Sequence, residues 1–225
     1  MARQAAGPPI DELDSYERRP VNQARREAII AYGGATVLDV GCGNGSYVRE
    51  FDTERTTIGL DSHRFPSWNQ SHRFVLSDAV RLPIHDASVS TVTCFETLEH
   101  LPDPLGALRE YARVTHGSLI LTVPNCTTTP GMDASNLIYR HFVDRTHVNF
   151  FNVESITALV REAGFEIVHV RLINEIDVFP LVGEVFRLPA LWIRVLRKLL
   201  HRYARRYPMT CLVVAQPRRF ADSEG

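Results

Sequence analysis

Residues 37–45 read Val-Leu-Asp-Val-Gly-Cys-Gly-Asn-Gly, an apolar run that ends in three alternating glycines. The apolar, β-branched part is typical of a buried parallel strand. Glycine lets the backbone turn tightly and approach a ligand, and residues 46–51 can then open a helix that points its N-terminus at that ligand. The loop runs G-x-G-x-G after the acidic Asp39, whereas a dinucleotide fingerprint runs G-x-G-x-x-G. The stretch therefore predicts a strand–loop–helix unit for a nucleoside-type cofactor; the alternative is a glycine-rich connection without a ligand.

Strand and helix signals alternate along the rest of the chain, which predicts an α/β fold with a parallel sheet in one domain spanning residues 1–225. Two connections, 124–150 and 174–208, fit this alternation poorly. Ligands bind at the carboxyl ends of parallel strands, and we expect both insertions to cover the substrate there. Helices are expected at 20–32, 103–114 and 153–163, the last closed by Gly164, and strands at 36–40, 56–60, 73–76, 90–95, 118–123, 165–170 and 210–215.

The composition is that of an ordinary globular protein, with 44% hydrophobic and 23% charged residues among 225. A net charge of −1 provides no overall field that would attract nucleic acid. The four cysteines form no C-x-x-C pair and are expected to be buried, reduced thiols. The N-terminal residues show no secretory signal, and no apolar run reaches the roughly 20 residues that span a bilayer. We therefore expect a cytoplasmic location.

Three further acidic or aromatic positions follow the next strands in order. Asp61 ends the second strand, about 20 residues beyond the glycine loop, where an acid can accept hydrogen bonds from both ribose hydroxyls. Asp78-Ala79 follows the third strand, and Phe95 ends the fourth. Together with the glycine loop, these segments resemble the class I S-adenosylmethionine (SAM)-dependent methyltransferases. The resemblance implies a seven-stranded Rossmann-like sheet, SAM as the cofactor, and cofactor contacts from Asp39, Gly41, Gly43, Asn44, Gly45, Asp61, Ser62, Asp78, Ala79 and Phe95.

The segment after the fourth strand carries a candidate metal site. Glu96, Glu99 and His100 are spaced i, i+3 and i+4, so they would share one face if a helical turn begins here. Two carboxylates and an imidazole suit a divalent cation. The alternative is an E-H pair that caps the next helix or packs in the interior without a metal.

The pattern E-x-x-E-H resembles two families that bind Mg²⁺ or Mn²⁺ through these residues, the ubiquinone-biosynthesis O-methyltransferases and the small-RNA 3′-terminal 2′-O-methyltransferases. The resemblance implies a further histidine ligand before an aromatic residue and a helix. His147 matches that position, and His141 is the second choice.

This chemistry indicates a metal-assisted O-methyltransferase. A hydroxyl is a poor nucleophile, and a cation chelated by two neighbouring hydroxyls would lower the hydroxyl pKa. His100 or His147 could accept the proton. The favoured acceptor is a vicinal diol on a sugar, oligosaccharide or polysaccharide precursor. Alternatives are a metal-independent methyltransferase acting on a quinol, catechol or natural product, an RNA 2′-O-methyltransferase, and a non-catalytic SAM-binding module.

The 174–208 insertion combines many apolar residues with a basic cluster. It could form a lid over the acceptor, an interfacial helix on a membrane, or a helical pair packed on the body or on a second subunit. The expected partners are a small-molecule or glycan acceptor, a membrane surface met peripherally through 187–206, and a second copy in a homodimer, with nucleic acid disfavoured.

Overall fold

The computed structural model describes residues 20–68, 73–135, 140–200 and 207–218. Its centre is a seven-stranded sheet with the strand order β3-β2-β1-β4-β5-β7-β6. Strands β1 to β5 pair in parallel, and β7 runs antiparallel to both β5 and β6. This is the Rossmann-like sheet that the resemblance implied. The strands are β1 (Thr36–Val40), β2 (Thr56–Asp61), β3 (Phe74–Leu76), β4 (Val89–Phe95), β5 (Thr115–Pro124), β6 (Phe165–Glu175) and β7 (Pro208–Pro217).

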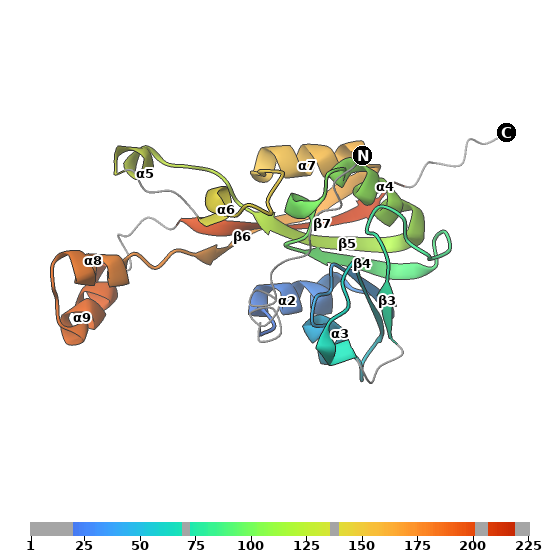
Figure 1. Ribbon diagram of the computed structural model, residues 1–225, viewed down its shortest axis with the longest axis horizontal. Coiled ribbons are helices and arrows are strands. Elements are labelled where there is room, and N and C mark those ends of the chain that lie inside the picture. The colour runs from blue at the N-terminus through green and yellow to red at the C-terminus, as the bar shows by residue number, and fades with distance from the viewer. Residues whose placement is uncertain (1–19, 69–72, 136–139, 201–206, 219–225) are drawn as a thin grey trace.

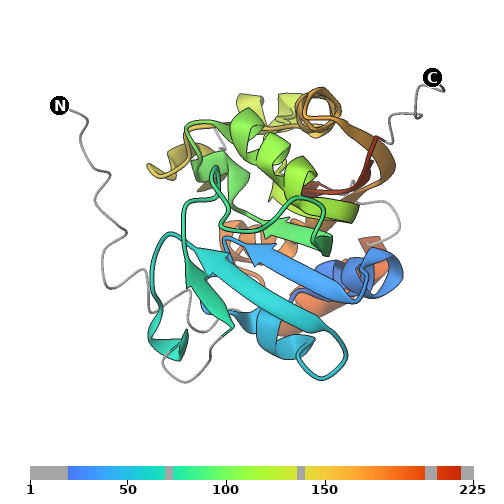
Figure 2. The same cartoon turned by 90° about the vertical axis from the view of Figure 1, so that its right-hand side faces the viewer.

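Helices cover both faces of the sheet, as Figures 1 and 2 show. On one face lie α2 (Gln23–Tyr32) and α3 (Ser46–Glu50), and on the other α4 (Pro104–Val114) and α7 (Val153–Glu162). The 3₁₀ turns η1 (Pro66–Trp68) and η2 (Leu98–His100) follow β2 and β4. Two pairs of helices complete the described elements: α5 (Pro130–Ala134) with α6 (Arg140–Val143), and α8 (Phe179–Val185) with α9 (Ala190–Leu200).

The apolar core has one layer on each side of the sheet. Leu38, Leu121 and Tyr111 belong to the layer under α4 and α7, whereas Ile29 and Ile120 belong to the layer under α2. The central strands are buried on both faces, which explains why they read as continuous apolar runs rather than as alternating patterns.

Side-chain caps define the helix boundaries. The Asn22 side chain accepts hydrogen bonds from the first turn of α2, and Asp103 accepts one from the Gly106 amide at the start of α4. Asn152 and Ser155 form a capping box at α7. Beyond α7, Gly164 has φ +98°, a left-handed conformation that glycine adopts readily, so the predicted stop is confirmed.

The sixth strand differs from its prediction. β6 continues to Glu175, beyond the expected end at residue 170, and pairs with β7 from its first residue, Pro208. The insertion therefore contains the end of this two-stranded ribbon and the hairpin of α8 and α9 at its tip (Figure 1). Within the described residues, no helix has the length and apolarity needed to cross a membrane. Residues 201–206 of the basic segment lie outside the described residues.

The four cysteines are free thiols, as expected. Cys42, Cys94 and Cys211 are buried, but Cys126 is only half-buried because it lies in the connection after β5 rather than in a strand. For Cys126 the prediction of a buried thiol is wrong.

Candidate active site at the carboxyl edge of the sheet

The glycine loop connects β1 to α3 at the carboxyl edge. Gly45 has φ +76°, and a Cβ there would lie 2.4 Å from Cζ of Phe74, so the loop and the β3 ring require glycine. The space above Gly43 is open, because the nearest heavy atom to a Cβ there is Cζ of Phe65 at 4.0 Å. The loop therefore leaves room for a ligand at its middle glycine.

Asp61 ends β2 beside this loop. Its Oδ2 accepts a hydrogen bond from the Gly43 amide at 2.9 Å, and its Oδ1 accepts one from the His63 amide at 3.0 Å. Burial raises the pKa of the Asp61 carboxyl. Each carboxylate oxygen has a second lone pair, so the residue can still accept hydrogen bonds from a ligand diol. Ser62 lies beside it, with Oγ 2.9 Å from Nδ1 of His63.

Asp39 lies beneath the loop, inside the sheet. It is 2% exposed, and Oγ1 of Thr93 donates a 2.7 Å hydrogen bond to its Oδ1. Burial raises the pKa of Asp39 to about 7, and the charge of Asp61 acts in the same direction. The carboxyl is thus held by Thr93 inside the sheet, two residues before the first glycine of the loop.

The remaining predicted cofactor residues differ in their surroundings. Oδ1 of Asp78 accepts a hydrogen bond from the Val80 amide at 3.1 Å, and Ala79 is part of the core. The Phe95 ring lies 4.8 Å from the Tyr47 ring and under the Arg25 guanidinium. Phe95 thus belongs to the core layer under α2.

Trp68 is a loop contact that the sequence interpretation missed. Its Nε1 donates a 2.8 Å hydrogen bond to the Gly43 carbonyl, and its ring stacks on Phe74 with centroids 4.8 Å apart. Asn44 is held from two sides, since Arg49 and Ser67 both donate to its carbonyl oxygen. The available signal was an aromatic residue a few positions after the acid that ends β2.

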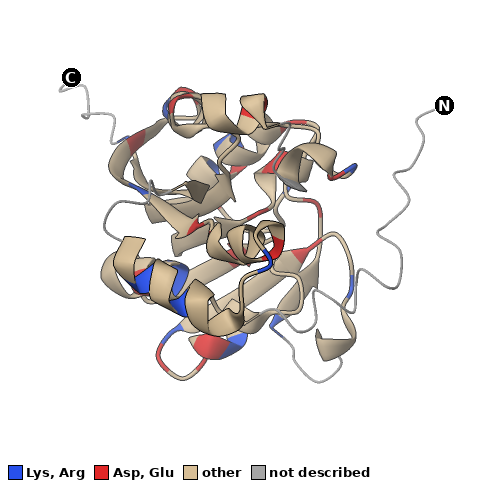
Figure 3. Ribbon diagram, turned by 90° about the vertical axis from the view of Figure 1, so that its left-hand side faces the viewer, with Lys and Arg blue, Asp and Glu red and all other residues tan. Residues whose placement is uncertain are grey.

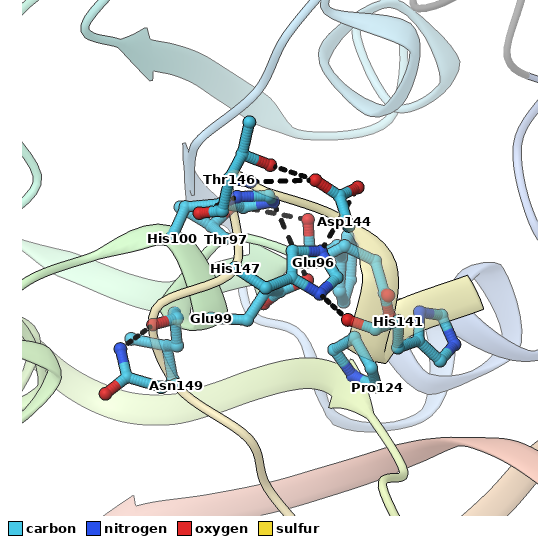
Figure 4. Close-up of polar contacts among 12 residues, drawn as sticks. Glu96, Thr97, Glu99, His100, Pro124, His141, Asp144, Thr146, His147 and Asn149 are labelled. Carbon is cyan, nitrogen blue, oxygen red and sulfur yellow. Dashed lines mark hydrogen bonds and ion pairs between the residues drawn. The ribbon is translucent and has the colours of Figure 1, made fainter. Parts of the chain in front are cut away.

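A second cluster of polar groups lies after β4. Ligand atoms of Glu99, His100 and His147 all lie within 4.8 Å of one another. Figure 4 shows these three side chains close together. Glu99 and His100 come from η2, and His147 comes from the connection before α7. The amides of Val148 and Asn149 donate to the Glu99 carbonyl at 2.8 and 3.1 Å, which holds the two segments together. The structure therefore brings together three of the four predicted metal ligands.

The Glu99 carboxylate is 1% exposed, and neither of its oxygens has a hydrogen-bond partner within the described part of the chain. Burial raises the pKa of this carboxyl well above its ordinary value, and the nearby charge of Glu96 adds to the effect. A buried carboxylate without partners is costly, so the group is either protonated or matched by a cation.

The Nε2 atoms of the two histidines lie near carboxylates, that of His100 at 3.9 Å from Oε1 of Glu99 and that of His147 at 3.7 Å from Oδ2 of Asp144. Nδ1 of His100 lies 3.1 Å from the Thr146 carbonyl oxygen, and Nδ1 of His147 lies 3.0 Å from the His141 carbonyl oxygen. A carbonyl only accepts, so each Nδ1 carries a hydrogen, and the neutral form of either ring would have its lone pair on Nε2. Metal-ligating histidines typically make this hydrogen bond with their second nitrogen. Burial also lowers the pKa of His100, which favours its neutral ring.

Glu96 does not join the cluster, and the prediction that Glu96, Glu99 and His100 share one helical face is wrong. The 3₁₀ turn begins only at Leu98, and Glu96 has φ +51°. Its Oε1 instead accepts a 2.7 Å hydrogen bond from Nη2 of Arg25 on α2.

Two other residues of the 124–150 connection adjoin His147. Asp144, whose Oδ2 lies 3.7 Å from Nε2 of His147, is a carboxylate that the sequence interpretation missed. His141, the second choice for a ligand, accepts the His147 hydrogen bond through its carbonyl and stacks with that ring at 5.9 Å. Its contribution in the structure is thus to orient His147.

Comparisons with known proteins agree with this architecture. A family model described as a methyltransferase domain matches residues 13–170. A Mycobacterium tuberculosis protein named a probable S-adenosylmethionine-dependent methyltransferase is 31% identical over 142 residues, covering 57% of this chain and 48% of that protein. The ubiquinone biosynthesis O-methyltransferase of Xanthomonas euvesicatoria pv. vesicatoria is 30% identical over 170 residues, covering 65% of this chain and 70% of that protein.

Solved structures show the same fold. A SAM-dependent methyltransferase from Archaeoglobus fulgidus superposes with a TM-score of 0.62 at 21% identity, covering 86% of this chain and 91% of that one. The chain spans about half the length of the mycobacterial relatives that it matches. The strand order and the glycine loop agree with the family match, which covers more than half of the chain. The chain therefore belongs to the class I SAM-dependent methyltransferases.

Proposed function

We propose that this protein transfers the methyl group of SAM to a hydroxyl oxygen, with a divalent cation, Mg²⁺ or Mn²⁺, held by Glu99, His100 and His147. The observation that carries the proposal is the Glu99 carboxylate, which is buried without a hydrogen-bond partner in the described chain and has a ring nitrogen of His100 and one of His147 within 4.8 Å. A cation would offset the cost of burying this charge. One carboxylate and two imidazoles leave coordination positions for an acceptor.

The proposed cofactor site uses the glycine loop and the acids that follow β2 and β3. Asp61 would accept hydrogen bonds from the ribose hydroxyls of SAM, because the Gly43 and His63 amides fix its orientation. Asp78 would face the adenine amino group, as the family resemblance implies. The open space above Gly43 is where the backbone can approach the cofactor.

The acceptor that suits this site carries two neighbouring hydroxyls. A divalent cation lowers the pKa of a hydroxyl that binds it, and chelation by both oxygens orients one of them toward the methyl group. A vicinal diol on a sugar, oligosaccharide or polysaccharide precursor meets this requirement. Each histidine has one free nitrogen, so a histidine that binds the cation cannot also accept the proton; a histidine released from that role would act as the base.

A second candidate is a metal-independent O-methyltransferase acting on a quinol, catechol or natural product. The raised pKa of Glu99 favours it, because a protonated, neutral carboxyl needs no cation. The similarity to a ubiquinone-biosynthesis O-methyltransferase is compatible with such an acceptor.

Metal binding by the unmodified protein distinguishes the two candidates without any acceptor. We expect Mn²⁺ titration, followed by electron paramagnetic resonance, to show one site that is lost in Glu99→Gln and in His147→Gln. His116→Gln is the matched control, because Nδ1 of His116 also bonds a backbone carbonyl, that of Ala87, away from the cluster. The absence of Mn²⁺ binding up to millimolar concentration would exclude the metal site.

Turnover supplies the second measurement. Labelled SAM should be consumed with a polyol, glycan or catechol acceptor only when Mg²⁺ or Mn²⁺ is present, and EDTA should abolish transfer. Full transfer in EDTA would establish the metal-independent reaction instead.

A further inference from the structure

The hairpin of α8 and α9, residues 179–200, stands beyond the ends of β6 and β7 and away from the body of the protein (Figure 1). The two helices pack on each other, since a Cβ at Gly183 of α8 would lie 2.2 Å from Cδ1 of Ile193 on α9. Ile193 and Leu196, the α9 side chains on this side, are half-buried. Phe179, Val182 and Leu188 are half-buried as well, whereas the remaining large apolar side chains of the hairpin are exposed.

One face of α9 is apolar and exposed. Leu191, Val195 and Leu199 follow one another at intervals of four residues, and Trp192 lies beside them. Leu191 is 65% exposed, Trp192 58% and Leu199 64%. The same holds for Leu181, Val185 and Phe186 of α8 and its end. An exposed apolar surface of this kind is typical of a site that contacts a membrane or another molecule.

Cationic side chains border this face. Arg194 and Lys198 lie one turn apart on α9, next to the exposed leucines, and form no ion pair with any described residue. Residues 177–200 carry four cationic side chains and two carboxylates, whereas the whole chain has a net charge of −1. One of the two carboxylates, Asp177, is bonded to Arg197 at 2.5 Å. Figure 3 shows these basic residues gathered on the hairpin.

We propose that this hairpin binds the surface of an anionic phospholipid bilayer. Its exposed leucines and Trp192 would enter the boundary between headgroups and acyl chains, while Arg194 and Lys198 reach back to lipid phosphates. The charge favours this occupant over a second copy of the chain, because two copies meeting through this face would bring like charges together. Protein interfaces are also depleted in lysine, whereas a basic border is what an anionic bilayer attracts.

The hairpin leaves the sheet at the carboxyl edge, which is also the edge that holds the glycine loop and Glu99. A protein docked through the hairpin would therefore keep its active-site edge near the lipid surface. The proposal concerns binding alone and does not depend on the metal or on the acceptor.

Co-sedimentation of the full chain with vesicles tests the proposal. We expect binding to vesicles of phosphatidylcholine and phosphatidylglycerol at a 70:30 ratio, weak binding to phosphatidylcholine alone, and release in 0.5 M NaCl. Arg194→Gln with Lys198→Gln should weaken binding about 25-fold, at about fivefold for each cation. Leu191→Gln with Leu199→Gln should weaken it at least tenfold.

The matched controls are Ile30→Gln, an exposed apolar residue on α2, and Arg109→Gln, an exposed cation on α4; both should bind as the unmodified protein does. All substituted side chains are exposed, and unchanged circular dichroism spectra would confirm that the variants are folded. Equal binding of the two hairpin variants and the unmodified protein would overturn the proposal. So would a dimer, seen by light scattering, that dissociates in the leucine variant and does not bind vesicles.

Discussion

Asp39 is a carboxyl group that the fold holds inside the sheet, bonded to Thr93. Burial raises its pKa from 3.8 to about 7, so the folded protein binds this proton more tightly than the unfolded chain does. The contribution of Asp39 to the free energy of unfolding is therefore fully present below about pH 4 and is lost as the pH rises to about 7. Most of that loss falls between pH 5 and 7.

Asp39→Asn should remove this pH dependence, because the amide resembles the protonated acid and its oxygen can still accept from Thr93. We expect the unmodified protein to lose about 2–3 kcal/mol more unfolding free energy than Asp39→Asn between pH 5 and 8. Urea denaturation at both pH values measures the difference, with the exposed α5 carboxylate variant Asp133→Asn as the control. Parallel losses in the two proteins would show that Asp39 ionises in the folded state as it does in the unfolded chain.

At the scale of elements, η2 shows how far local spacing predicts a site. The family resemblance placed Glu99 and His100 near His147, and the structure brings ligand atoms of these three residues together. Glu96 was misplaced because spacing of i, i+3 and i+4 presumes a helix from its first residue, and this turn begins two residues later. Its partner, Arg25, is 71 positions away, and no local pattern indicates such a contact.

The Arg25–Glu96 pair ties α2 to the segment that carries the candidate metal ligands. Both side chains are mostly buried, so removing either one leaves the other without its partner. We expect Arg25→Met and Glu96→Gln each to lower the unfolding free energy, with a coupling of about 1–3 kcal/mol in the double variant. Urea denaturation of the four proteins gives this value. Additive effects of the two substitutions would mean that the pair does not hold α2 in place.

At the scale of the whole molecule, the sheet was predictable because its central strands are buried on both faces and therefore read as apolar runs. The end of β6 was not, because its residues 171–175 are mostly exposed and are ordered by pairing with β7 rather than by an apolar pattern. Trp68 and Asp144 were missed for a related reason. Trp68 contacts Gly43, which is distant in the sequence, and Asp144 contacts His147 within a loop. Neither contact leaves a periodic pattern in the sequence.

If the hairpin of α8 and α9 makes no essential contact with the body of the protein, its removal should leave the sheet folded. The Ile176 amide donates a 3.0 Å hydrogen bond to the Tyr207 carbonyl, so the strands are already paired where the hairpin departs. Replacing residues 177–206 with Asn-Gly should close a tight turn there. The shorter connection has a smaller entropy of closure, so we expect an unfolding free energy equal to that of the full chain or up to about 2 kcal/mol higher.

SAM affinity, measured by calorimetry, should stay within twofold of the affinity of the full chain. The glycine loop follows β1 and Asp61 ends β2, and three strands, β4, β5 and β7, separate β1 from β6. Vesicle binding should be lost. The sequence predicted that the insertion containing this hairpin covers the substrate, with a membrane contact or packing on the body or on a second subunit as alternatives. A large fall in SAM affinity or in stability on its removal would identify the hairpin as such a cover, packed on the body when ligands are bound. Unchanged SAM affinity together with lost vesicle binding would instead show that the hairpin attaches the protein to the bilayer and makes no contribution to SAM binding.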